Sequence, residues 1–302
     1  MRKAFAESMI ELAEKDDKLV LLIGDISHYL LKDFEDRFPN RFFNAGICEQ
    51  SIVGVAAGLA MEGYRPVVHT IAPFCVERAY EQIKVDLCYQ ELDVTIISVG
   101  SSFDYAHLGC THHCYEDISI LRPLPNIDLF VPGTSSEYKK LINDSWNNGR
   151  SKYFKLTKTE HNNIIDVSAY RNNILNVGNG DVAVFVNGHL LGEVTKLKDY
   201  KKHTVVYCPT VEPIEEASQK QIASILRDSK VSIVVEENSS AGAFADKIFD
   251  IASHNNVRAL IKKIGIPRKF CTNYGTADEH RQHLGLTSQQ IENTIKEALR
   301  NV

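Results

Sequence analysis

The sequence predicts an α/β protein built from two doubly wound domains. Short runs rich in Val, Ile and Leu alternate along the chain with segments of helical periodicity. Runs that are apolar throughout are typical of parallel strands buried on both faces, and their alternation with helices predicts a doubly wound sheet. A polar stretch interrupts the alternation, and 302 residues suffice for two ordinary domains. We therefore expect domains at 1–165 and 180–302, joined by a linker at 166–179.

The first domain is expected to open with an amphipathic helix within residues 1–18. Five apolar runs then predict strands, and three segments between them have helical periodicity. The expected strands are 20–23, 66–70, 94–99, 127–131 and 153–156, and the expected helices are 52–62, 76–89 and 136–146.

The second domain repeats the alternation and ends in a helix that Thr287 caps. The expected strands are 182–186, 204–207, 231–235 and 259–264, and the expected helices are 190–197, 214–226, 243–252 and 287–299.

Composition excludes several classes of protein. Lys and Arg number 34 against 39 Asp and Glu, and the resulting net charge of −5 disfavours nucleic-acid binding. Hydrophobic residues make up 44% and charged residues 24%, a balance typical of a folded chain. No apolar run approaches the roughly 20 residues that span a bilayer, and the charged N-terminal segment is not a secretory signal. Seven irregularly spaced cysteines indicate reduced thiols, so we expect a cytoplasmic protein without a membrane partner.

A carboxylate stands at the start of a helix made of small residues. Glu49 precedes 51–60 (SIVGVAAGLA), a segment that another backbone can approach closely. A helix this apolar should be buried, and Glu49 with it. A buried carboxyl group can share a proton with a ligand nitrogen. The alternative is that Glu49 only caps the helix N-terminus, where negative charge is favoured.

The loop after the expected strand 94–99 is crowded with His and Cys, since 109–117 reads GCTHHCYED. Loops that follow parallel strands form the sites of doubly wound sheets. Cys110 and Cys114 around adjacent histidines invite a zinc interpretation, but the second ligand pair of structural zinc sites is missing, and we expect no metal ligands here. A histidine presented to substrate and ordinary loop polarity remain as alternatives.

Longer segments around these motifs resemble the C-terminal half of transketolase, and most of all the C-terminal subunit of split, two-gene transketolases. The matches span nearly the whole chain in the family's order and spacing. The TH-x3-ED and RAYEQIK features favour transketolase over 1-deoxyxylulose-5-phosphate synthase and the pyruvate dehydrogenase beta subunit. The resemblance implies a thiamine-diphosphate pyrimidine-binding domain followed by a transketolase C-terminal-like domain. The matching segments are 41–70, 74–84, 109–133, 234–244, 264–270 and 274–291.

The resemblance also implies which residues bind the cofactor. In this family the Glu that matches Glu49 hydrogen-bonds N1′ of the aminopyrimidine and promotes its imino tautomer, a catalytic role. Phe74 matches the aromatic residue that packs on the pyrimidine ring, and Ile71 stands where the family often has a second Phe. We expect Asp25, after the first strand, and Arg78, in the RAYEQIK segment, to complete the cofactor site.

The resemblance further implies a catalytic histidine and a substrate site. His112 matches the His of the Gly-x-Thr-His motif, which lies over the thiazolium and assists substrate hydroxyls. Arg2 and Lys158 match phosphate-contacting arginines, although Lys loses the bidentate fork. We also expect Tyr29 and His107 to line the substrate site.

Three positions depart from the family in the set that contacts the acceptor sugar. Leu108 stands where the family has an Asp, Tyr29 where it has a Ser, and Gly100 where it has a His. These changes indicate an altered acceptor.

The family's Gly-Asp-Gly…Asn motif for Mg²⁺ and diphosphate is absent from this chain. We therefore expect an N-terminal transketolase-like partner subunit that supplies the Mg²⁺ ligands, in a heterotetramer with two chains of each kind. The expected enzyme is a transferase, active only with that partner, that moves a two-carbon ketol unit from a ketose or ketose phosphate to an aldehyde. Two alternatives remain: a 2-oxoacid decarboxylating ligase or dehydrogenase, of the deoxyxylulose-phosphate-synthase or pyruvate-dehydrogenase-beta type, and a non-catalytic scaffold.

Overall fold

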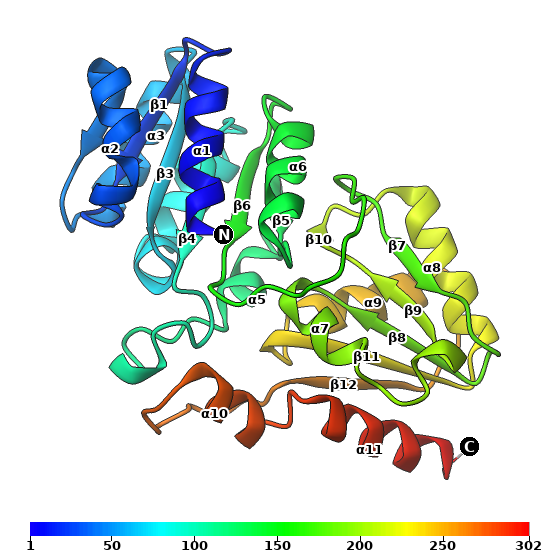
Figure 1. Ribbon diagram of the computed structural model, residues 1–302. Coiled ribbons are helices and arrows are strands. Elements are labelled where there is room, and N and C mark those ends of the chain that lie inside the picture. Colours follow the sequence, from blue (N-terminus) through cyan, green and yellow to red (C-terminus); the bar gives the residue numbers. More distant parts are fainter. Residues whose placement is uncertain (302) are drawn as a thin grey trace.

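The computed structural model describes residues 1–301 and contains two β-sheets flanked by helices (Figure 1). The first sheet has seven strands in the order β10-β5-β6-β4-β3-β1-β2, and the second has five in the order β12-β11-β8-β9-β7. All pairings within the sheets are parallel except those of β10 and β7. The predicted class, with two α/β domains, is confirmed.

The strands of the first sheet form because their residues are apolar and their two faces are covered. Every residue of β1, β4, β5 and β6 is buried. The register places Leu21 of β1 opposite both Phe42 of β2 and Val67 of β3. The six parallel strands are β1 (Leu19–Ile23), β2 (Phe42–Asn44), β3 (Arg65–Ile71), β4 (Thr95–Val99), β5 (Ile127–Phe130) and β6 (Ser151–Lys155).

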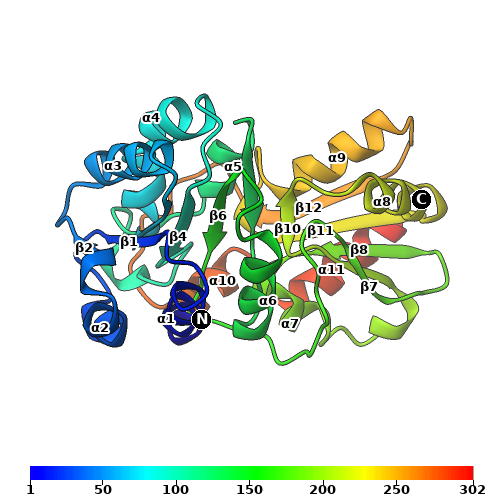
Figure 2. The ribbon, with the colours of Figure 1, turned by 90° about the horizontal axis from the view of Figure 1, so that it is seen from above.

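Two groups of helices cover the two faces of this sheet (Figure 2). One face carries α1 (Arg2–Ala13), α2 (His28–Arg37) and α6 (Ser135–Ser145). The other carries α3 (Glu49–Met61), α4 (Tyr80–Gln82) and α5 (Asp117–Leu121), with π-helical turns at Pro73–Glu77 and Ile83–Cys88.

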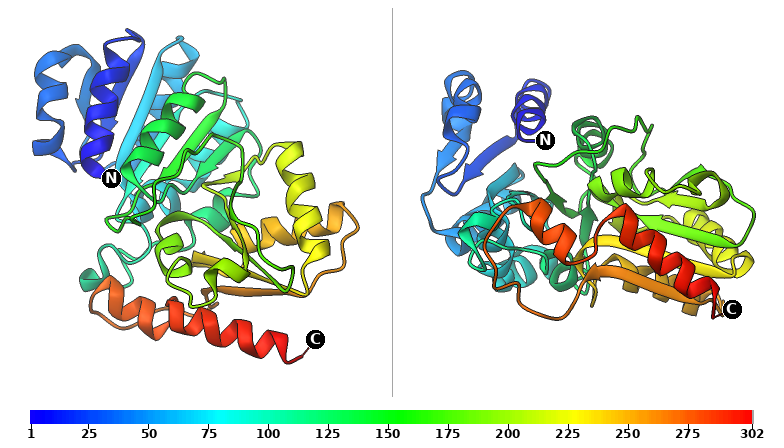
Figure 3. Two further views of the ribbon diagram at one scale, coloured as in Figure 1. Left: turned by 45° about the vertical axis from the view of Figure 1, so that its right-hand side comes forward. Right: turned by 60° about the horizontal axis from the view of Figure 1, so that its bottom comes forward.

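The second sheet is built in the same way. Its strands are β7 (Asn173–Asn176), β8 (Val182–Val186), β9 (Thr204–Tyr207), β11 (Val231–Ser239) and β12 (Ile261–Ile266). Figure 3 shows α10 (Ala277–His283) and α11 (Ser288–Leu299), in orange and red, beside this sheet, with α11 and α7 (Leu191–Val194) packed on one face. The other face is covered by α8 (Glu216–Asp228) and α9 (Phe244–His254). Short 3-10 turns lie at Pro39–Arg41, Ala106–Leu108, Gly188–Leu190 and Tyr200–Lys202.

The second half of the chain contributes one strand to the first sheet. Strand β10 (Thr210–Glu212) pairs antiparallel with β5, and the Val131 N–H donates to the Pro209 carbonyl at 2.7 Å. Strand β7 lies inside the segment 166–179 that the sequence indicates as a linker. The exact domain boundaries therefore stay a prediction.

Several elements differ from the expected ones. The segment 76–89 is not one α-helix, because π-helical turns interrupt it on both sides of α4. Only four residues of 190–197 are α-helical. The elements α2, β2, α5, β7, β10 and α10 were not anticipated. No helix within residues 1–301 is long and apolar enough to cross a membrane.

Candidate active site

The candidate residues follow neighbouring strands at one edge of the first sheet. Strands β6, β4, β3 and β1 are adjacent, and their C-terminal ends point the same way because they are parallel. Side chains from different loops can therefore meet there. The residues concerned are Asp25 after β1, Ile71, Phe74 and Arg78 at and after the end of β3, the loop 100–116 after β4, and Lys158 after β6.

Glu49 is buried at the first position of α3, and its side chain is only 2% exposed. Arg78 Nη1 donates to Glu49 Oε2 at 2.7 Å. No side chain caps the N-terminus of α3, and Oε1 of Glu49 has no hydrogen-bond partner among residues 1–301. The carboxylate therefore turns toward Arg78, and one oxygen remains available to a ligand.

Phe74 and His112 lie beside this ion pair. The guanidinium carbon of Arg78 lies 4.2 Å from the ring centre of Phe74. The rings of Phe74 and His112 meet edge to face at 5.2 Å. The structure thus brings Glu49, Arg78, Phe74 and His112 into one connected group.

The loop 100–116 that carries His112 is fixed at its base. Ser102 and Cys114 exchange backbone hydrogen bonds of 2.7 and 3.1 Å. The second domain holds the same base, because the Ser102 hydroxyl donates to the Glu237 carbonyl at 2.8 Å. Within the loop, the ring of Phe103 stacks on His280 of α10 at 4.6 Å. His112 therefore stands on a loop anchored by both halves of the chain.

The state of the His112 imidazole follows from its surroundings. Partial burial, and to a smaller degree the neighbouring His107, lowers the pKa of His112 below its ordinary value. Its Nδ1 lies 3.0 Å from the Thr111 hydroxyl. When that hydroxyl donates to Nδ1, the ring proton sits on Nε2 and is free to be donated.

Arg2 and Lys158 converge on one aromatic ring. The Lys158 ammonium lies 4.6 Å and the Arg2 guanidinium carbon 5.5 Å from the ring centre of Tyr105. Arg2 also donates to the Tyr105 hydroxyl, and Lys158 Nζ donates to the Asp104 carbonyl at 2.9 Å. Both cations line a cavity of about 200 Å³, whose other lining residues are Met1, Val99, Asp104, Leu156 and Thr157.

Three predicted residues lie on the exposed surface rather than in this group. Asp25 accepts from the Asn44 amide at 3.1 Å, and this contact and one with His28 lower its pKa. Tyr29 is fully exposed. His107 is exposed, with its ring 6.3 Å from that of Tyr105.

The sequence analysis did not single out Tyr105 or His69 as candidate site residues. His69 is fully buried in β3, with Nδ1 2.9 Å from the Ile97 carbonyl and Nε2 2.9 Å from the Ser27 hydroxyl. Burial lowers the pKa of His69 to about 4, so the ring is neutral near pH 7. A histidine inside an apolar strand was the signal that could have marked it.

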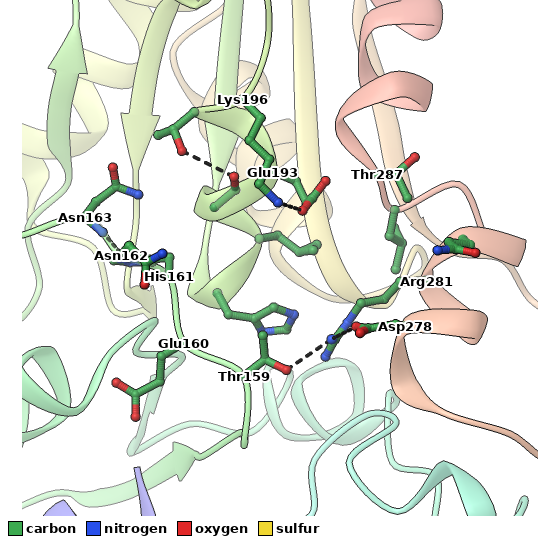
Figure 4. Close-up of a pocket in the computed structure, with 16 residues that line it drawn as sticks. Thr159, Glu160, His161, Asn162, Asn163, Glu193, Lys196, Asp278, Arg281 and Thr287 are labelled. Carbon is green, nitrogen blue, oxygen red and sulfur yellow. Dashed lines mark hydrogen bonds and ion pairs between the residues drawn. The ribbon is translucent and has the colours of Figure 1, made fainter.

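A larger cavity, of about 600 Å³, borders the second domain and is lined mainly by polar residues (Figure 4). Several of its charged groups are paired with protein groups. Arg281 donates to Thr159 and Asp278 at 3.1 and 3.0 Å, and Lys196 pairs with Glu193. Within residues 1–301, no three His, Cys, Asp or Glu side chains are grouped so as to hold a metal ion.

Comparison with known proteins identifies the class to which the chain belongs. Residues 1–163 match the family model described as "Transketolase, pyrimidine binding domain". This match covers more than half of the 302 residues, and the chain therefore belongs to the transketolase family.

Individual relatives make the assignment more particular. The chain is 30% identical, over 94% of each sequence, to a subunit of apulose-4-phosphate transketolase from Actinobacillus succinogenes. It is also 30% identical to an uncharacterized 33.6 kDa protein in the fasciation locus of Rhodococcoides fascians, over 99% of this chain and 95% of the relative. A split gene transketolase, solved as an inactive β4 tetramer, matches with a TM-score of 0.86 and 26% identity, over 99% of this chain and 97% of that one. The predicted relationship to the C-terminal subunit of a split transketolase is confirmed.

Proposed function

We propose that the chain is the pyrimidine-binding subunit of a two-component, thiamine-diphosphate-dependent ketol transferase. The observation that carries the proposal is the buried carboxylate of Glu49, which has one oxygen paired with Arg78 and the other available. A structural helix cap would instead bind the amide groups of the first turn of α3.

The residues present fit the aminopyrimidine end of thiamine diphosphate. Such a ring has a nitrogen that can exchange a proton with a carboxylate and a flat face that can stack on an aromatic side chain. Glu49 would supply the carboxylate and Phe74 the aromatic face, and Arg78 contacts both of these residues. Because the sequence lacks the Gly-Asp-Gly motif, we assign the Mg²⁺ ligands and the diphosphate site to a partner subunit.

Each residue of the group has a stated task in this proposal. Thiamine diphosphate, when bound, supplies a nucleophilic carbon and an electron sink for breaking a C–C bond. Glu49 would hold or release the proton at the ring nitrogen. His112, neutral because its pKa is lowered, can donate to or accept from a substrate hydroxyl. Arg2 and Lys158 would hold a substrate phosphate.

The acceptor is proposed to differ from that of a housekeeping transketolase. Leu108 is 43% exposed and Tyr29 fully exposed, so both present apolar or aromatic surface where the family has polar side chains. One relative is named for apulose 4-phosphate, which supports a sugar phosphate of a specialised pathway as the substrate class.

The proposal is tested by adding the partner subunit. We expect the chain alone to bind thiamine diphosphate weakly and to show no turnover in the presence of Mg²⁺, because half of the cofactor site is missing. With an N-terminal transketolase-like subunit, ketol transfer should appear. With xylulose 5-phosphate and ribose 5-phosphate, we expect a kcat/KM below about 10⁴ M⁻¹s⁻¹, the lower edge of ordinary enzyme efficiency.

Other outcomes of this assay would contradict the proposal. Tight cofactor binding by the isolated chain would remove the need for a partner. Consumption of pyruvate with release of CO₂ would indicate a decarboxylating ligase or dehydrogenase. A complex that binds the cofactor and transforms neither class of donor would indicate a scaffold.

A further inference from the structure

We propose that Tyr105 is a specificity-determining residue whose hydroxyl donates a hydrogen bond to the phosphate of a sugar substrate. This inference deepens the proposed function and rests on it. Tyr105 lies in the loop 100–116, between β4 and α5, in the same loop as His112.

The ring of Tyr105 occupies space that a side chain at position 100 would need. A Cβ built on Gly100 would lie 2.2 Å from Cε2 of Tyr105 and 3.3 Å from Cγ2 of Ile71. Gly100 also has a φ of +76°, a conformation that side-chain-bearing residues rarely adopt. The Tyr105 ring can therefore lie in this position only because residue 100 is a glycine. The ring comes from the loop after β4, next to Ile71 at the end of β3.

The hydroxyl of Tyr105 is prepared to donate a hydrogen bond. Arg2 Nη2 already donates to the phenol oxygen, so the phenol proton is free for another acceptor. The guanidinium and the Lys158 ammonium both lie against the ring, at 5.5 and 4.6 Å from its centre. Two cations beside the ring favour an anionic acceptor for that proton.

A second observation at the same place points to an anionic ligand. The Nε of Arg2 is buried and has no hydrogen-bond partner within residues 1–301. Arg2 and Lys158 both line the adjacent cavity of about 200 Å³. Asp104 lies there too, but its two carboxylate oxygens accept the Lys158 backbone N–H at 3.1 and 2.9 Å. Burial has the largest effect on Asp104 and raises its pKa. The raised pKa makes the carboxyl group less readily ionised and so reduces its electrostatic repulsion of an anion.

The ring of Tyr105 lies near the two cations that line this cavity and also near His112. The ring centres of Tyr105 and His112 are 6.1 Å apart. A sugar phosphate bound by Arg2, Lys158 and Tyr105 would therefore have its phosphate held beside the histidine that serves its hydroxyls. A phosphate monoester, with several anionic oxygens, can accept from all three groups at once.

The test compares Tyr105→Phe with the wild type in the complex with its partner subunit, loaded with thiamine diphosphate and Mg²⁺. Phe keeps the ring against Gly100 and removes only the hydroxyl, so the fold is retained. A hydrogen bond to a charged group contributes about 1.5–3 kcal/mol, which corresponds to roughly a 10- to 150-fold change in affinity at about 1.4 kcal/mol per tenfold. We expect KM for glyceraldehyde 3-phosphate to rise by about 10-fold or more, with KM for unphosphorylated glyceraldehyde and kcat changing less than about twofold. Tyr89→Phe, at an exposed position, is the matched control.

A second readout needs no turnover. Calorimetry with inorganic phosphate on the loaded complex should show the same loss of affinity in Tyr105→Phe. Equal phosphate affinity in the two proteins, or equal KM for the phosphorylated aldehyde, overturns the assignment of Tyr105. If the wild-type complex transfers no ketol unit at all, the proposed function fails, and the two phosphate affinities still decide the role of Tyr105.

Discussion

The two halves of the molecule share an architecture and differ in how two of their buried carboxylates are satisfied. In the first half, Arg78 is the one hydrogen-bond partner of the Glu49 carboxylate among the residues that the structure describes, and the Arg78 side chain is 39% exposed. In the second half, Glu237 is buried and binds His189 at 2.9 Å together with buried Arg281. Burial would raise the pKa of Glu237, but the charges of His189 and Arg281 outweigh it and hold that pKa well below its usual range. The carboxylate that is fully paired serves stability, and the one left partly free at the strand ends is the one suited to a ligand.

The largest expected effect tests the structural half of this comparison. Glu237→Gln would leave His189 and Arg281 without their carboxylate, and breaking a buried pair by removing one partner costs about 3–5 kcal/mol. Urea unfolding of the chain should show this loss. Glu215→Gln is the matched control, because the Glu215–Arg171 pair is solvent-exposed and should contribute less than about 1 kcal/mol. Similar stabilities for the two variants would remove the distinction between the halves.

The next effect tests the functional half. Glu49→Gln keeps the shape of the side chain but cannot exchange a proton with a ring nitrogen in the same way. Proton transfer by a positioned group contributes roughly 10²–10⁴-fold, so we expect turnover of the complex to fall at least about 100-fold. The free energy of unfolding should fall less than in Glu237→Gln, because the Arg78 side chain is 39% exposed and water can solvate it when its partner is neutral. Glu62→Gln, at the exposed C-terminal end of the same helix, should leave both unchanged. Near-normal turnover in Glu49→Gln would return Glu49 to a capping role.

The smallest expected effect is a loss of folding stability at mildly acidic pH, caused by the buried His69. The pKa of His69 is about 4 in the folded chain and 6.5 ordinarily. Between these values the unfolded state binds more protons, so stability present above about pH 6.5 is lost as pH falls toward 4. This linkage predicts a loss of about 1 kcal/mol at pH 5.5 relative to pH 7.5. His69→Gln should flatten this slope in urea titrations at the two pH values, whereas His254→Gln, at an exposed position, should keep it. An unchanged slope in His69→Gln would exclude His69 as its source.

The sequence allowed prediction wherever the physical cause is local. Uniform apolar runs marked most strands of both sheets, and a carboxylate before a small-residue helix marked Glu49. Strands β7 and β10 were missed because they span only four and three residues and exist through pairing with distant segments. Tyr105 was missed because its place depends on a glycine five residues earlier that has no side chain. Sequence motifs and periodicity do not show that the space left by one residue is filled by the side chain of another.

Strand β10 limits how freely the two halves can be recombined. Since it completes the edge of the first sheet against β5, a chain cut between the sheets would expose unpaired backbone groups along β5. Exposed edges of this kind invite pairing with other chains and aggregation. A chimera that exchanged the second half for that of a relative would have to preserve the pairing of the three-residue strand β10 with β5. In protein engineering, the two domains should therefore be exchanged together.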